Sequence, residues 1–212
     1  MRKQSLIDSL ITEVDQALRT VHTLAPTTER SNPANNISSE LSDTEKKQSA
    51  SLMRINHAGE VSAQGLYRGQ ALTAKREDIR EQMARSAMEE NDHLNWCETR
   101  LNELDDHKSY LSPLWYLGSF GIGAAAGLVG DKWSLGFVKE TEDQVVKHLD
   151  EHLGKLPASD KTSRAILEQM KIDEAHHADV AVEAGAAELP APIRKVMMPL
   201  MSKLMTSISG KL

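Results

Sequence analysis

The sequence is poor in several residue types, and each shortage excludes a class of protein. With Cys97 as its single cysteine, the chain cannot form an internal disulfide, which fits a reducing cytosol. Aromatic residues make up only 4%, and no basic stripe offsets the net charge of −6, so no nucleic-acid partner is expected. The abundant residues are Ala, Leu, Glu, Lys, Gln and Met, which favour helix. The 212 residues are enough for one sizeable core.

The first residues are not expected to act as a secretory signal, because acidic residues such as Asp8 and Glu13 interrupt their apolar positions. It is typical of an amphipathic helix instead. Residues 25–40 contain two prolines and three asparagines, which indicate a linker or a long loop. We therefore expect an N-terminal amphipathic helix and linker in residues 1–40, followed by a helical domain in residues 41–212.

Capping signals and helix breakers divide the rest of the chain into helices. Ser42 and Glu45 form a capping-box pattern, which predicts the start of a long helix. Gly154 is a natural helix end, and Pro199 predicts a kink in a Met- and Leu-rich amphipathic tail. The predicted helices cover about 42–74, 77–106, a third that ends at 154, 160–184, and the tail from 192 to 212.

One motif occurs twice, a glutamate followed three residues later by a histidine. The pairs are Glu90 with His93 and Glu174 with His177, and residues at this spacing share one face of a helix. Either pair alone is more typical of a charged helix face in solvent. The placement of the other glutamates therefore decides what the pairs mean.

Two lone glutamates mirror the paired ones about the expected turns. In an antiparallel hairpin, residues at equal distance from the turn lie at the same height. A turn in TAKRED places Glu60 opposite Glu90. A turn in LPASD places Glu142 opposite Glu174. The chain is thus expected to form two hairpins, each with one lone glutamate and one Glu-x-x-His pair.

Four carboxylates in one core need compensation, because each buried charge costs several kcal/mol. Two divalent cations cancel four carboxylates, and two neutral imidazoles complete their coordination. This ligand set is that of di-iron and di-manganese helical bundles. Mixed oxygen and imidazole ligands favour iron or manganese, and zinc also accepts them. Cys97, four residues after His93, is either a thiol ligand or, more commonly, a small buried apolar residue.

The stretch RINHAGEVSAQGLYRGQ, residues 54–70, resembles the first signature of the demethoxyubiquinone hydroxylases, the di-iron monooxygenases of ubiquinone biosynthesis. EENDHL, KETEDQVVKHLDEHL and DEAHHAD resemble the later signatures in order and spacing, so the resemblance covers roughly residues 45–212. One departure is Leu149, which follows His148 where many members have a tyrosine. The family's metal ligands carry over as Glu60, Glu90, His93, Glu142, Glu174 and His177, the set that the mirrored spacing also gives.

The resemblance implies a hydroxylation in a ferritin-like four-helix bundle. Two ferrous ions would reduce O2, and oxygen would enter an unsubstituted ring carbon of a polyprenylated methoxybenzoquinol, demethoxyubiquinol. The electron donor is either the quinol itself or NADH, since no nucleotide-binding glycine fingerprint follows a strand in this chain. The partners that it implies are the polyprenylated quinol, the membrane surface, and either other ubiquinone-biosynthesis proteins or a second copy of the chain.

Four further residues near the ligands have expected places. His57 lies one turn before Glu60 and is either a hydrogen-bond partner of a ligand or a structural histidine. Tyr67 lies two turns after Glu60 and is a candidate for lining the substrate pocket. His148 and His176 fall off the ligand face, so His148 is expected to have a structural or hydrogen-bonding role.

The stretch from residue 109 to residue 130 has no charged side chain and is long enough to be a membrane-span candidate. A single crossing would place half of the ligands on each side of the bilayer, so the metal site argues against it. The stretch suits the long crossover of a ferritin-like bundle, and with the amphipathic tail it predicts peripheral binding to the cytoplasmic face of the cell membrane. The alternative is burial in the core or in a dimer interface.

Two other functions compete with hydroxylation. A ferritin-like or rubrerythrin-like protein would store iron or remove peroxide, but storage needs a shell assembly and no lipid-facing surface. A metal-free helical adaptor at the membrane would need none of the six ligands. Metal analysis separates the adaptor from both metal-binding alternatives.

Overall fold

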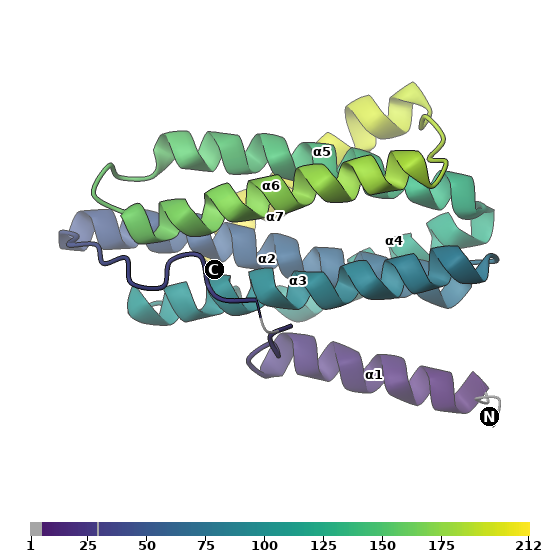
Figure 1. The fold of residues 1–212 in the computed structure, drawn as a ribbon, viewed down its shortest axis with the longest axis horizontal. Coiled ribbons are helices and arrows are strands. Elements are labelled where there is room, and N and C mark those ends of the chain that lie inside the picture. Colours follow the sequence, from purple (N-terminus) through teal and green to yellow (C-terminus); the bar gives the residue numbers. More distant parts are fainter. Residues whose placement is uncertain (1–5, 29) are drawn as a thin grey trace.

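Helices and the loops between them make up the part of the chain that the computed structural model describes, residues 6–28 and 30–212 (Figure 1). No strand occurs among these residues, so the all-α prediction is confirmed. Residues 1–5 of the predicted N-terminal helix lie outside the described residues. The helices are α1 (Leu6–His22), α2 (Asp43–Thr73), α3 (Glu77–Glu103), α4 (Ser112–Val129), α5 (Asp131–Lys155), α6 (Lys161–Glu183) and α7 (Met198–Ser209), with a π-helical turn at Ile193–Met197 before α7.

Two antiparallel hairpins, α2 with α3 and α5 with α6, form the four-helix bundle (Figure 1). The Ser42 hydroxyl accepts a hydrogen bond from the backbone N–H of Glu45, and the Glu45 carboxylate accepts one from the backbone of Ser42, so the predicted capping box starts α2. The carboxylate of Asp131 at the start of α5 accepts the backbone N–H groups of Lys75 and Arg76, each at 3.0 Å. These hydrogen bonds connect the predicted turn between α2 and α3 to the start of the second hairpin.

The core of the bundle is layered along the helix axes. One apolar cluster includes Met53, Trp96 and Met170, and a second, further along all four helices, includes Tyr67 and Leu135. The helix positions between the two clusters carry the predicted ligands. Each helix thus alternates an apolar layer, a carboxylate layer and another apolar layer, and the apolar layers keep bulk water from both ends of the ligand layer.

The crossover between the hairpins is the helix α4, which packs against α2 at very short range. A Cβ atom at Gly69 would lie 2.1 Å from the backbone oxygen of Phe120, and one at Gly123 would lie 2.2 Å from that of Leu66. Only glycine permits this approach. The other side of α4 exposes large apolar side chains such as Leu117, so the stretch is half buried rather than enclosed in the core.

None of the helices in residues 6–28 and 30–212 has the combination of length and apolarity needed to cross a bilayer. The sequence-based argument against a span at residues 109–130 therefore agrees with the structure.

Two predicted boundaries were wrong. Helix α3 ends at Glu103 instead of Asp106, because Asp105 takes a left-handed conformation with φ of 56°. Helix α5 continues through Gly154 to Lys155, because Pro157 forces the residue before it into an extended conformation and so ends the helix without a glycine cap. In the tail, the π-helical turn Ile193–Met197 lies just before Pro199, where the sequence predicts a kink, and such turns are a common cause of kinks.

Candidate metal centre

Two carboxylates and two imidazoles form the middle of the ligand layer. The Glu90 carboxylate places Oε2 at 3.0 Å from Nδ1 of His93 and Oε1 at 3.2 Å from Nδ1 of His177. Glu174 does the same from the facing helix, with Oε1 at 3.1 Å from Nδ1 of His93 and Oε2 at 3.2 Å from Nδ1 of His177. Each of the two glutamates therefore spans both histidines, one oxygen to each ring, which is the arrangement of a carboxylate that bridges two positions.

The two lone glutamates lie on opposite sides of this group of two carboxylates and two imidazoles, Glu60 near His93 and Glu142 near His177. Oε2 of Glu60 lies 3.6 Å from Nδ1 of His93. Glu142 accepts a hydrogen bond of 2.7 Å from the hydroxyl of Tyr67 and lies close enough to His177 for the imidazole to influence its ionisation. The structure brings all six predicted residues into one layer, and each of them is at most 7% exposed.

The ligand layer contains more acidic groups than basic groups that could compensate their charge. Burial, together with the charges of Glu174 and Glu90, raises the pKa of Glu60 and that of Glu142 well above the usual range. Burial also opposes ionisation of Glu90, but His93 and His177 outweigh it and lower the pKa of Glu90. The protein alone thus keeps some of its carboxyl groups neutral, and a cation would allow all of them to ionise.

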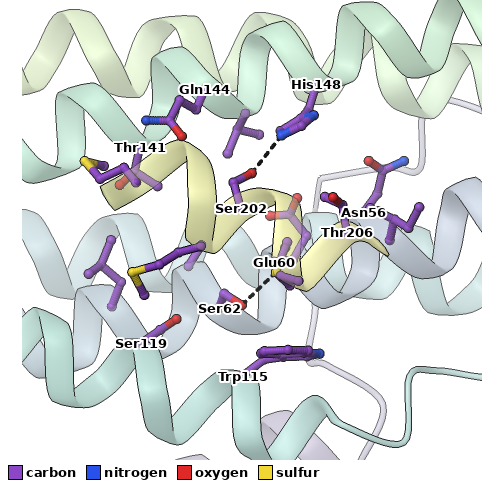
Figure 2. A pocket seen from close by; sticks show the side chains of 18 of the residues that line it. Asn56, Glu60, Ser62, Trp115, Ser119, Thr141, Gln144, His148, Ser202 and Thr206 are labelled. Carbon is purple, nitrogen blue, oxygen red and sulfur yellow. Dashed lines mark hydrogen bonds between the residues drawn. The ribbon is translucent and has the colours of Figure 1, made fainter. Parts of the chain in front are cut away.

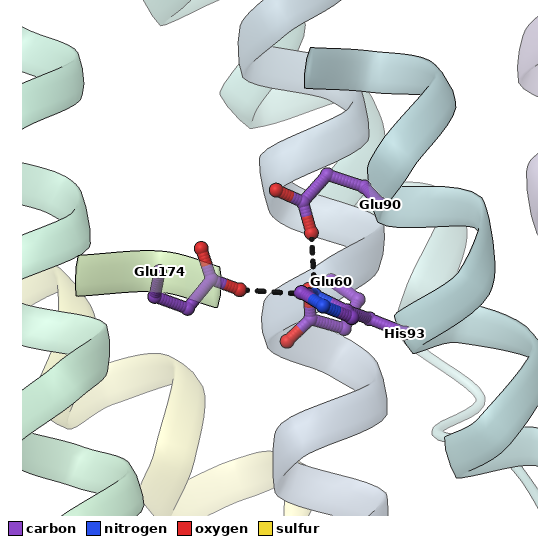
Figure 3. Close-up of side chains that lie close together, drawn as sticks. All are labelled: Glu60, Glu90, His93 and Glu174. Carbon is purple, nitrogen blue, oxygen red and sulfur yellow. Dashed lines mark hydrogen bonds and ion pairs between the residues drawn. The ribbon is translucent and has the colours of Figure 1, made fainter. Parts of the chain in front are cut away.

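The donor set fits a metal ion. Carboxylate oxygens of Glu60, Glu90 and Glu174 and a ring nitrogen of His93 lie within 4.8 Å of one another, and all four residues are buried (Figure 3). Oε1 of Glu90 is buried, and apart from its approach to Nδ1 of His177 it has no hydrogen-bond partner, so it is available to a metal ion. Oxygen and imidazole nitrogen are donors that iron and manganese accept. This buried cluster could bind metal.

Two acids behind the histidines were missed by the sequence reasoning. Asp173 on α6 places Oδ2 at 3.0 Å from Nε2 of His93 on α3, and Glu89 on α3 places Oε2 at 2.9 Å from Nε2 of His177 on α6. Such partners fix the ring so that the opposite nitrogen faces the metal. A signal existed, because each acid directly precedes a ligand glutamate, Glu90 or Glu174, and so reaches across to the other hairpin.

The remaining candidates take different places. Tyr67 contacts Glu142 and is not among the residues that line the large cavity described below. Nε2 of His148 lies 2.7 Å from the hydroxyl of Ser202, in agreement with a hydrogen-bonding role, and His176 is exposed. Cys97 is fully buried with its sulfur 3.8 Å from that of Met170, as a small apolar residue would be.

A cavity of about 430 Å³ reaches the centre from the side where α2, α4, α5 and α7 meet (Figure 2). Most of its wall is apolar, and Glu60 is one of the few charged groups in it. Polar groups from Asn56, His148 and Ser202 also face it, as the close-up shows. Leu114 and Leu204 line it and are more than half exposed, so the apolar wall continues to the surface.

His57 is fully buried, and neither of its ring nitrogens has a hydrogen-bond partner. Nε2 of His57 lies 3.9 Å from Oε2 of Glu98, and Glu98 pairs with Lys108 at 3.0 Å. Burial first, and the charge of Lys108 second, lower the pKa of His57 to about 3.

His57 is therefore expected to reduce the stability of the metal-free protein as the pH falls. Between about pH 6.5 and pH 3 the unfolded chain protonates His57 while the folded chain does not, so folding is penalised by at most about 1.4 kcal/mol per pH unit. His57→Gln removes this group, and its stability should fall less steeply than that of the parent. Urea unfolding at a series of pH values measures both slopes, and parallel profiles would contradict the assignment.

Comparison with known proteins identifies the family. Residues 47–209 match the family model described as "Ubiquinone biosynthesis protein COQ7". The chain belongs to the COQ7 family. The resemblance inferred from the signature stretches is thereby confirmed, and the COQ7 match includes all six residues of the ligand layer.

Relatives named "3-demethoxyubiquinol 3-hydroxylase" are similar to this COQ7 protein over almost its full length. One from Nitrosococcus oceani is 58% identical over 206 residues, covering 97% of this chain and 96% of the relative. One from Chromohalobacter salexigens is 55% identical with the same coverage. One from Acinetobacter baumannii is 53% identical over 209 residues and covers 99% of each chain.

Proposed function

We propose that the chain is a 3-demethoxyubiquinol 3-hydroxylase, a di-iron monooxygenase that hydroxylates demethoxyubiquinol with O2 in ubiquinone biosynthesis. Membership of the COQ7 family and the names of relatives that are 53% and 58% identical support this activity. The observation that carries the chemistry is the position of Glu90 and Glu174, each of which directs one oxygen to His93 and the other to His177. In this proposal residues 41–212 are the hydroxylase domain, and residues 1–40 add a helix and a linker.

The six residues divide into two halves that share the middle pair. Glu60 and His93 would hold one iron ion, Glu142 and His177 the other, and Glu90 and Glu174 would contact both. When bound, the irons would supply the activation of O2, of which one oxygen atom enters the ring while two electrons from the donor reduce the other to water. The protein's own side chains fix the two positions: the Tyr67 hydroxyl orients Glu142, and the apolar layers exclude water.

The cavity fits the quinol. Its apolar wall suits a methoxybenzoquinol ring that lies beside Glu60, and its open side between α4 and α7 would let the polyprenyl tail pass outward (Figure 2). Asn56 and His148 would provide polar contacts for the ring oxygens. The electrons would come from the quinol itself or from NADH. The protein partner of the chain would be a second copy of it or another ubiquinone-biosynthesis protein.

A wider side chain in the cavity should impair substrate binding without disturbing the metals. Gly118 lines the cavity, and a Cβ atom there meets nothing within 4 Å. Gly118→Leu is expected to raise KM about tenfold or more, since a blocked pocket loses apolar contact with the ring or tail. Steady-state kinetics with a short-chain quinol measure the change.

Gly121→Leu is the matched control. Gly121 lies one turn further along α4, also has open space around its Cβ position, and does not line the cavity. Its KM should remain that of the parent. Equal effects of the two substitutions would argue against this cavity as the substrate site.

The same surface would hold the protein on the cytoplasmic face of the cell membrane. Large apolar side chains on α4 and α7, among them Leu117 and Leu200, are about two-thirds exposed. A helix with such a face lies in the headgroup region without crossing the bilayer. Membranes washed with alkaline carbonate should release the protein. Retention that only detergent overcomes would contradict a peripheral location.

A deletion strain tests the reaction itself. Cells that lack the protein should accumulate the demethoxy precursor and regain ubiquinone when the gene is returned, and the purified protein should contain about two irons per chain. Normal ubiquinone in a deletion strain without a second hydroxylase would refute the activity. Bound iron with an unchanged quinone profile would favour an iron-storing or peroxide-removing protein of the ferritin or rubrerythrin type.

A further inference from the structure

The segment that connects α1 to α2 is fastened beside the metal centre. The carboxylate of Asp92 on α3 accepts the backbone N–H of Thr28 at 2.8 Å and also the Thr28 hydroxyl. The side chain of Asn95, one turn further along α3, donates to the backbone oxygen of Ala25 at 2.8 Å. Asp92 is fully buried and directly precedes His93. The chain at residue 28 is therefore held next to a ligand histidine.

Arg30 extends from this anchored segment onto the acid behind that histidine. Its guanidinium donates a hydrogen bond of 2.6 Å to Oδ2 of Asp173, the same oxygen that lies 3.0 Å from Nε2 of His93. The guanidinium carbon lies 5.2 Å from the centre of the Trp96 ring, and the Trp96 ring is 5.4 Å from that of His93. Gln169 donates to the other oxygen of Asp173 at 2.9 Å. Asp173 is thus held from both sides.

The other half of the centre has weaker support, because Arg30 forms no ion pair with Glu89 and acts on it only as a nearby charge. The Glu89 side chain is 40% exposed, against 16% for Asp173. Apart from His177, no basic side chain in residues 6–28 and 30–212 forms an ion pair with Glu89. The two histidines therefore have unequal backing, one from a carboxylate fixed by arginine and glutamine, the other from a carboxylate that water reaches.

We infer that Arg30 is a positioning residue of the metal centre, which holds Asp173 against Nε2 of His93 and so keeps Nδ1 of His93 directed at the metal position. A guanidinium forms strong, directional hydrogen bonds to a carboxylate and stacks on aromatic rings, and both contacts are present here. Loss of a partner behind a metal-binding histidine typically weakens metal binding about 10–100-fold. The inference rests on the proposed metal site and assigns a role in it to the segment before α2.

The test is a Co²⁺ titration of the metal-free full-length protein, with visible absorption as the readout. It compares the parent, R30Q, D173N and the double variant. R30Q should weaken the binding of one of the two Co²⁺ ions about tenfold and that of the other much less. Because Arg30 acts through Asp173, the double variant should bind no more weakly than D173N alone. R30K keeps the charge but loses the fork geometry, so its affinity should fall between those of R30Q and the parent.

R19Q is the control, since Arg19 also precedes α2 but pairs only with the exposed Asp15 on its own helix. It should bind Co²⁺ as the parent does. Unchanged affinity in R30Q, or losses in R30Q and D173N that simply add, would overturn the role of Arg30. A parent protein that binds no Co²⁺ would instead count against the metal site itself, so the two failures are distinguishable.

Discussion

Glu142→Gln is expected to remove metal and hydroxylation while leaving the metal-free protein at least as stable as the parent. Glutamine has the shape of glutamate, and its amide oxygen can still accept the hydrogen bond from Tyr67, but it cannot supply an anionic ligand. Activity should fall at least about 100-fold, since even loss of an indirect partner costs about 10–100-fold. Iron quantitation and single-turnover hydroxylation measure the loss.

The stability of the metal-free variant should depend on pH in a defined way. Burial and the charges of Glu174 and Glu90 raise the pKa of Glu142 well above that of the unfolded chain. As the pH rises above about 4.5 the unfolded chain releases this proton and the folded chain does not, so the parent loses up to about 1.4 kcal/mol per pH unit until the folded group also ionises. Glu142→Gln lacks this loss, and its advantage over the parent should grow as the pH rises above about 4.5.

Glu151→Gln is the matched control on the same helix. Glu151 is exposed and contacts Lys155, one turn away, so its removal should change neither metal content nor activity. Full activity of Glu142→Gln would contradict the assignment of Glu142 as a ligand. A variant that binds metal normally but is merely less stable would show that Glu142 has a structural role only.

Gly69→Ala is expected to destabilise the protein by about 3 kcal/mol, which corresponds to a fall in Tm of roughly 6–12 °C. The added Cβ atom would lie 2.1 Å from the Phe120 oxygen and 2.7 Å from the Ala124 nitrogen, both backbone atoms that cannot turn aside. Helices α2 and α4 must therefore separate. Calorimetry or thermal circular dichroism measures the change.

Gly121→Ala provides the comparison, because its Cβ position is open and it lies on the same crossover helix. Alanine is favoured over glycine inside a helix by up to about 1 kcal/mol, so this variant should be as stable as the parent or slightly more stable. If both alanine variants behaved alike, the close approach of α2 and α4 would not limit stability.

The six ligand-layer residues could be found from sequence because each depends on local rules. The helix period places Glu90 and His93 on one face, and the turn positions fix which glutamate lies opposite. The acids Asp173 and Glu89 escaped notice because they reach across to the other hairpin, and the relative placement of hairpins depends on packing between distant segments. Arg30 was equally hidden, since its segment has the composition of a loop and its contact with Asp173 joins residues far apart in the chain.

The prediction of helix boundaries failed where a residue further along the chain outweighed the preference of the residue at the expected end. Gly154 has the chemistry of a helix end, but Pro157 sets the actual end of α5, at Lys155, one residue later than expected. The uncharged stretch at residues 109–130 could be recognised as a crossover, yet its position depends on Gly69 of α2 as much as on its own glycines. A pattern within one helix cannot reveal such a pairing.

In the proposed function the carboxylate layer would draw iron ligands from all four helices of the bundle, and this would make the iron supply of the cell a determinant of how long the protein survives. A ligand that binds only the folded chain adds about 2.7 kcal/mol when its free concentration is 100 times its dissociation constant. Under iron starvation that contribution disappears, opening of the helices becomes more frequent, and proteases gain access to the chain. The amount of enzyme would then follow iron availability without any change in transcription.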